Sequence, residues 1–185
     1  MAEDLRSYWD LVEPIFQHVD TTDVAKYSKS IEVIPRPVLL LFAAHFCLSE
    51  LHNGGLLQFF WNSTGIMAPE AIEGFEAIGM LELASVIGAA AAPLGSPYPR
   101  DRDDRWDAML AASGISEDEL TGIFKQQAAS DDGAGLYLGF VAATAELGFD
   151  ELTEQAWKLA STENGGFQGA ASRYAQQFRD SMGLP

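Results

Sequence analysis

The residues best suited to chemistry gather between Glu50 and Gly65, where one carboxylate shares a short stretch with several side-chain amides. The set is Glu50, Asn53, Gln58 and Asn62. Such a carboxylate–amide set could bind a small ligand or transfer a proton if Glu50 lay in a cleft with a shifted pKa. Alternatively, the four side chains form a polar network that satisfies backbone groups at a tight corner. The sequence favours the network, because a corner leaves backbone donors and acceptors in need of partners.

Other residue types that often carry chemistry are poorly arranged for it. His45 and His52 share a helical face but lie about 10 Å apart along the axis, whereas each ligand of a zinc ion lies about 2 Å from it. We therefore expect packed or hydrogen-bonded histidines. Cys47 lies in an apolar run without a nearby base to lower its pKa, which indicates a core residue. Nucleophile-elbow, phosphate-loop and zinc-protease motifs are missing. We predict no catalytic residue, metal or cofactor.

A corner between two helices is predicted at Asn53-Gly54-Gly55. Glycine adopts positive φ without a Cβ clash, and asparagine tolerates the same conformation. We therefore expect one helix to end here and another to begin almost at once. In the second helix, two pairs of apolar residues lie four apart, Leu56 with Phe60 and Leu57 with Trp61. Ser63 to Gly65 should end this helix.

These residues resemble the signature of a known family. The pattern is Glu50-x-x-Asn53-Gly54-Gly55-x-x-Gln58-Phe59-Phe60-x-Asn62-x-x-Gly65, followed by Ile78-Gly79. It is similar to that of the bacterial DNA-mimic proteins, long described as a domain of unknown function, and the resemblance covers about residues 35–110. It implies an acidic, non-catalytic protein that occupies the DNA-binding surface of a basic protein such as a transcription regulator.

The charge of the chain fits a cationic partner. Its 27 acidic and 11 basic residues give a formal net charge of −16, which disfavours binding to bare nucleic acid or to an anionic membrane. An acidic surface that serves only solubility remains an alternative. Only residues 24–36 are basic, with three bases against one acid.

Two acidic patches could form the partner-binding face. The glutamate stripe comprises Glu70, Glu73 and Glu76, and the aspartate cluster comprises Asp101, Asp103, Asp104 and Asp107. The stripe has no basic neighbours in sequence, and its spacing of about 4.5 Å along a helix is comparable to that of phosphates along a DNA strand. Arg100, Arg102 and Arg105 interleave with the cluster and should neutralise part of it in local ion pairs. We therefore expect the stripe, facing outward, to be the stronger patch.

The whole chain reads as helical. No stretch of useful length alternates apolar and polar residues, and the β-leaning run 31–34 is too short for a sheet. We predict one all-α domain over residues 1–185, an orthogonal bundle of about nine to eleven helices. A proline- and aspartate-rich linker is expected at 93–107 and a loop at 130–135.

Several helices and their ends can be predicted from local patterns. The first helix is expected at residues 3–19, where Pro14 should kink or split it. Thr22 and Asp23 offer a cap for a second helix. Residues 38–48 are apolar nearly all round, which predicts a buried central helix. Ser116-x-x-Glu119 is a capping box for a later helix.

The sequence also predicts where the protein acts and what it binds. The single cysteine and the acidic start, with no apolar leader, indicate the cytoplasm. We expect a basic nucleic-acid-binding protein as partner, with neither direct nucleic-acid nor membrane binding, and a homodimer remains open. The alternatives are an immunity or antitoxin-like inhibitor of a basic nuclease, and an enzyme or small-ligand binder at the amide residues.

Overall fold

The computed structural model describes residues 7–127 and 134–182, which form an all-α bundle as predicted. Within them there are ten α-helices, five short 3₁₀ segments and no strand. The α-helices are α1 (Trp9–Val12), α2 (Val24–Ile31), α3 (Arg36–Trp61), α4 (Ala68–Ala77), α5 (Leu81–Ala91), α6 (Arg102–Ser113), α7 (Glu117–Gln127), α8 (Ala134–Ala143), α9 (Phe149–Thr162) and α10 (Phe167–Met182). The 3₁₀ segments are η1 (Glu13–Ile15), η2 (Ser63–Met67), η3 (Ala92–Leu94), η4 (Ala145–Leu147) and η5 (Glu163–Gly165). No helix in the described ranges is both long and apolar enough to cross a membrane.

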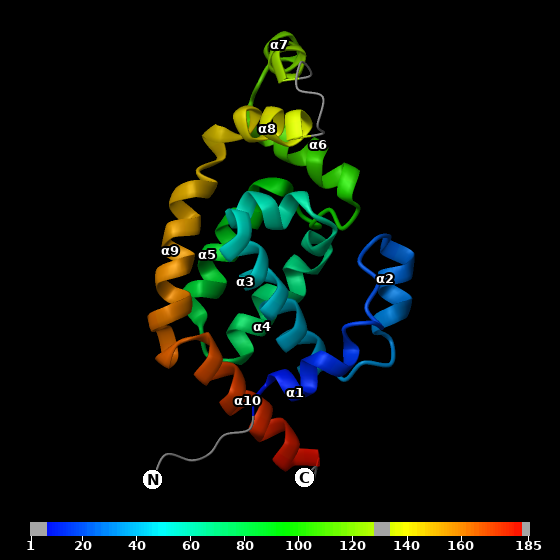
Figure 1. Cartoon of the computed structure of the whole chain (residues 1–185), viewed down its shortest axis with the longest axis vertical. Coiled ribbons are helices and arrows are strands. Elements are labelled where there is room, and N and C mark those ends of the chain that lie inside the picture. The colour runs from blue at the N-terminus through cyan, green and yellow to red at the C-terminus, as the bar shows by residue number, and fades with distance from the viewer. Residues whose placement is uncertain (1–6, 128–133, 183–185) are drawn as a thin grey trace.

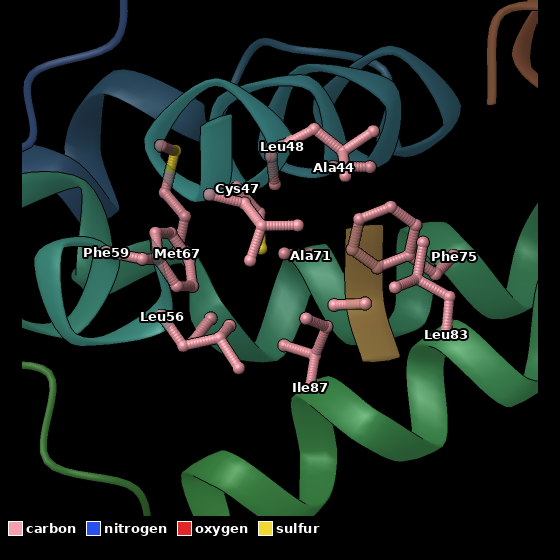
Figure 2. Packing of buried hydrophobic residues seen from close by; sticks show 14 of the residues in the cluster. Ala44, Cys47, Leu48, Leu56, Phe59, Met67, Ala71, Phe75, Leu83 and Ile87 are labelled. Atoms are coloured by element: carbon pink, nitrogen blue, oxygen red, sulfur yellow. The ribbon is translucent and has the colours of Figure 1, made fainter. Parts of the chain in front are cut away.

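Helix α3 is the centre of the bundle. It contacts α4, α9, α1, α6 and α10, and in Figure 1 α9 follows its left side while α7 and α8 lie above it. Its apolar run is buried on nearly all sides, as the sequence indicates. Figure 2 shows the core where α3 meets α4 and α5, with the side chain of Cys47 pointing toward Ala71. Burial raises the pKa of the Cys47 thiol, in keeping with a core residue.

Several predicted boundaries are confirmed by local interactions. Asp23 caps α2 by accepting hydrogen bonds from the backbone N–H groups of Ala25 and Lys26. Ser116 and Glu119 form a reciprocal capping box at the start of α7. Pro14 lies in η1, where the first helix tightens and ends.

Other boundaries differ from the prediction. Helix α6 begins at Arg102, so residues 102–107 of the expected linker 93–107 are helical, because Asp101 provides an N-cap. Helix α8 begins at Ala134, so the expected loop 130–135 is shorter at its end. Its residues 130–133 lie outside the described part of the chain, as do residues 3–6 of the first predicted helix.

A second Asn-Gly-Gly sequence, at residues 164–166, lies at the end of η5. Together with Glu163 it contacts the junction between α4 and α5, about 80 residues earlier in the chain. The carboxylate of Glu163 accepts hydrogen bonds from the backbone N–H groups of Glu82 (2.8 Å) and Leu83 (2.9 Å), which caps α5. The amide of Asn164 donates to the carbonyl of Ile78, just beyond α4 (2.8 Å). This segment therefore holds the junction between α4 and α5.

The predicted corner at residues 53–55 is a sharp break within α3. Gly55 has φ of 79°, in the left-handed region that side chains other than glycine's rarely adopt. A Cβ there would also lie 2.9 Å from Oγ1 of Thr153. Gly54 has φ of −159° and ψ of 19°, outside the left-handed region, and a Cβ there would lie 2.2 Å from Oε1 of Gln58. Gly55 is therefore required by its backbone conformation, whereas alanine at residue 54 would require the Gln58 amide to move.

We predict that Gly55→Ala lowers the free energy of unfolding by about 2 kcal/mol, because it adds both left-handed strain and the contact with Thr153. Gly88→Ala is the matched control. Gly88 lies inside α5 with no heavy atom within 4 Å of a built Cβ, so alanine there should stabilise by up to about 1 kcal/mol. Urea denaturation of the two variants measures the difference, and equal stabilities would contradict the role given to Gly55.

Candidate functional site

The carboxylate of Glu50 is the acceptor of a small polar network that spans the break in α3. Its Oε2 accepts hydrogen bonds from the amides of Gln58 (2.7 Å) and Asn62 (2.9 Å). Its Oε1 accepts one from the hydroxyl of Thr64 (2.7 Å). Gln58 and Asn62 lie four residues apart on one helical face, as the sequence predicts, and Glu50 reaches them from the preceding half of α3. The three donors are neutral, so hydrogen bonds rather than an ion pair hold the carboxylate.

The membership of this network differs from the predicted set. Thr64 belongs to it, although the sequence marks that residue only as part of a helix end. Asn53 is exposed, and its side chain forms no hydrogen bond with another described residue. The separation of 14 residues between Thr64 and Glu50 leaves no local pattern from which the contact could be inferred.

The backbone groups at the corner are satisfied by α9 and not by the amides, so that part of the network hypothesis is wrong. The N–H of Leu56 donates to the hydroxyl of Thr153 (3.0 Å). The indole N–H of Trp157 donates to the carbonyl of Leu51 (2.9 Å). These partners are 97 and 106 residues apart in the chain, so only the tertiary structure reveals them.

The two histidines bind different groups, as expected from their spacing. Nδ1 of His45 forms a hydrogen bond with the hydroxyl of Tyr8 (2.9 Å), and burial lowers the pKa of His45. Nδ1 of His52 donates to the carbonyl of Leu48 (2.7 Å). In the part of the chain that the structure describes, no three or more histidine, cysteine, aspartate or glutamate side chains form a group that could hold a metal ion.

The glutamate stripe differs most from its prediction. Glu70 is only 4% exposed, and it forms a two-point ion pair with Arg100 at 2.8 and 2.9 Å. Glu73 is exposed but pairs with Arg36. Within the described residues, only Glu76 of the stripe is both exposed and outside an ion pair. The expectation of an outward, unneutralised stripe is therefore wrong, because arginines distant in sequence reach it.

The structure also reverses the prediction for the aspartate cluster. All four of its residues are exposed, and none forms an ion pair with another described residue. The carboxylate of Asp101 accepts from the backbone N–H groups of Asp103 (2.9 Å) and Asp104 (3.4 Å), which starts α6. The predicted neutralisation by local ion pairs is wrong, and the interleaved arginines point elsewhere.

Two of those arginines, Arg102 and Arg105, bind the carbonyl groups at the C-terminal end of α3. The guanidinium of Arg105 is 0% exposed and donates to the carbonyls of Phe60 (3.0 Å) and Asn62 (2.8 Å). Nε of Arg102 donates to the carbonyl of Trp61 (2.8 Å), and its guanidinium stacks over the ring of Trp106 at 4.5 Å. A helix C-terminus carries partial negative charge and lacks internal donors, so positive side chains stabilise it. Burial lowers the pKa of Arg105, and the carbonyl groups compensate for its lost hydration.

The remaining signature residues support this arrangement. Phe59 and Phe60 are fully buried in the core. A Cβ at Gly65 would lie 2.7 Å from the carbonyl oxygen of Phe59 and 3.0 Å from Nε of Arg105, so only glycine leaves room for the guanidinium. The glycine therefore serves the contact between α3 and α6.

A family model described as DMP19-like protein matches residues 32–177. The chain belongs to the DMP19-like protein family. The match includes the break in α3, both acidic patches and most of α10, so it extends well beyond the resemblance over residues 35–110. It also includes the α9 residues Thr153 and Trp157, which close the corner. No curated protein and no solved structure matches this DMP19-like chain.

We predict that Glu50→Ala destabilises the protein by about 2 kcal/mol or more, because three partly buried donors lose their acceptor. Asn53→Ala, at an exposed position without a side-chain partner in the described chain, should change stability by at most about 0.5 kcal/mol. Chemical denaturation of both variants separates the two. A large loss for Asn53→Ala, or none for Glu50→Ala, would show that the network is assigned to the wrong residues.

Proposed function

We propose that this protein is a non-catalytic DNA mimic. Its partner would be a basic DNA-binding protein such as a transcription regulator, met in the cytoplasm, and the acidic surface would occupy the site that this partner uses for DNA. Membership of the DMP19-like family supports this class of function. The net charge of −16 supports a cationic partner and disfavours nucleic acid itself.

The observation that carries the proposal is the exposed aspartate cluster without paired arginines. Arg100 binds Glu70, and Arg102 and Arg105 bind carbonyl groups of α3. The carboxylates of Asp103, Asp104 and Asp107 are consequently available to a partner's lysine or arginine side chains. Asp103 and Asp107 are about 6 Å apart along the helix axis, which corresponds to roughly every second phosphate of a DNA strand.

The glutamate stripe is not part of the proposed face. Glu70 is buried, and Glu73 would have to release Arg36 before it met a partner. The proposed face is therefore the surface of α6 that carries the aspartate cluster, and Glu76 is a separate exposed acid.

An enzyme or ligand site at Glu50 has less support. Both carboxylate oxygens already accept hydrogen bonds from side chains of the same chain. The alternative function, inhibition of a basic nuclease, would use the same acidic surface. It differs from DNA mimicry of a regulator in that the partner cleaves DNA.

The test is competition between this protein and DNA for a captured partner. Immobilised protein is exposed to cytoplasmic extract at low and high salt, and proteins that elute as salt rises are identified. We expect a DNA-binding protein whose complex with duplex DNA is displaced by this chain, since electrostatic association weakens as salt screens it. A partner that binds DNA and this chain simultaneously would refute mimicry, and a nuclease whose activity is blocked would favour the inhibitor.

We predict that the triple variant Asp103→Asn, Asp104→Asn, Asp107→Asn weakens this complex by roughly tenfold at low salt, with most of the loss in association rate. The matched control is Glu76→Gln, Glu82→Gln, Glu154→Gln, which removes the same charge from exposed positions outside ion pairs in the described chain. Surface plasmon resonance measures both. Equal losses would mean that net charge alone drives binding, which contradicts a specific face on α6.

A further inference from the structure

A groove of about 980 Å³ lies where α7 meets the end of α6 and the end of α8. Figure 1 shows these three helices together at one end of the molecule. Ile115 and Ile123 line the groove, and glycines and alanines make up most of the remaining lining. Its volume is at the upper end of the range of about 300–1,000 Å³ found for ligand sites. The groove therefore has room for several side chains of another molecule.

Helix α8 also has an apolar side that is exposed to solvent. None of its residues is charged, and a helix that is apolar on all sides is typically buried. Phe140 and Ala143 are buried, but Leu138 is 48% exposed and Val141 is 36% exposed. Ala142, which lines the groove, lies four residues from Leu138 and so on the same helical face. The exposed side of α8 therefore continues the apolar surface of the groove.

The charges around the groove are mostly negative. Glu119 and Glu146 line it, against one lysine, Lys125. Glu119 also caps α7 by accepting hydrogen bonds from Ser116, and it keeps its charge there. Residues 106–149 include seven acidic residues and one basic one.

An exposed apolar surface with a polar rim is typical of a protein-interaction site. Because the rim of this groove is acidic, the complementary occupant carries positive charge. A second copy of this chain fits poorly, since it would bring the same acidic residues together. The groove thus favours an occupant that is both apolar and basic.

We propose that this groove binds an amphipathic helix with basic residues on its polar side, contributed by a partner protein. The apolar side of that helix packs against Ile123, Leu138 and Ala142, as in other complexes in which a helix lies in a groove. Its lysine or arginine side chains meet Glu119 and Glu146. The groove is distinct from the aspartate cluster, and binding there does not require that the partner binds DNA.

The test measures binding of a fluorescently labelled helical peptide to the full-length protein by anisotropy. The peptide has about 18 residues, with leucines at helical spacing of three and four and lysines elsewhere. One comparison peptide replaces each lysine with glutamate, and the other replaces each leucine with serine. At about 0.15 M salt, we expect saturable binding of one leucine–lysine peptide per chain below about 100 µM, and binding of both comparison peptides weaker by at least about tenfold.

Substitutions in the protein locate the binding site. Leu138→Gln removes an apolar contact and should lower the affinity for the leucine–lysine peptide by about tenfold. Ala142→Gln places a longer polar side chain in the groove and should lower it as well. Leu81→Gln is the matched control, because Leu81 is an exposed leucine of α5 outside the groove, and this variant should bind as the parent does. All three positions are exposed, so the variants should melt at the temperature of the parent within a few degrees.

Several results would overturn the inference. Binding of the serine–lysine peptide as tight as that of the leucine–lysine peptide would show attraction by charge alone, and binding of the glutamate peptide would show that the acidic rim has no role. Unchanged affinity in both Leu138→Gln and Ala142→Gln, or an equal loss in Leu81→Gln, would place the peptide elsewhere. Sedimentation that showed a dimer of this chain, dissociated by Leu138→Gln, would mean that a second copy covers the groove.

Discussion

The C-terminal end of α3 needs hydrogen-bond donors, and the way α6 supplies them determines much of the structure. Arg105, Arg102 and Trp106 reach back from one turn and a half of α6 to the carbonyls of residues 60–62. A guanidinium with several N–H groups suits this role, because it can satisfy adjacent carbonyls while its charge complements the helix end. Because Arg102 and Arg105 bind these carbonyls, they do not pair with the aspartates of the same helix, which are exposed. The stability of α3 and the acidity of the surface therefore arise from the same contact.

The break within α3 likewise leaves backbone groups in need of hydrogen-bond partners, and another helix supplies them. Helix α9 satisfies backbone groups of Leu51 and Leu56 on either side of Gly55, and Glu50 joins the two halves through Gln58 and Asn62. The signature residues consequently divide by task. The glycines permit close approach of side chains, the phenylalanines fill the core, and the carboxylate and amides connect the two halves. None of these tasks requires contact with a partner, which is why the proposed partner face lies outside the signature.

The sequence predicted those features whose causes are local. The break at Gly55, the cap at Asp23, the capping box at Ser116 and the all-α class follow from residue types a few positions apart. Contacts between distant segments were not predictable in this way. The pairs Arg100–Glu70 and Arg36–Glu73 are separated by 30 and 37 residues, and they reverse the expected ranking of the two acidic patches. Spacing of three between glutamates could not show which of them faces the core, because that depends on how α4 is rotated against α3. The roles of Thr153 and Trp157 had no local signal at all.

The central claim is that Arg105 of α6 is bound to the carbonyls at the end of α3. Hydrogen exchange of the arginine side chains tests it most directly, because the Nε–H of Arg105 is either held by α3 or free in solvent. The Nε–H of Arg105 donates to the carbonyl of Phe60 in a fully buried position, whereas Arg173 is exposed and donates through Nη2. The account predicts that the Arg105 Nε–H signal in a ¹H–¹⁵N spectrum exchanges at least about a hundredfold more slowly than that of Arg173. Exchange of both at the same rate would contradict it, since Arg105 would then be free to pair with the aspartates at the surface.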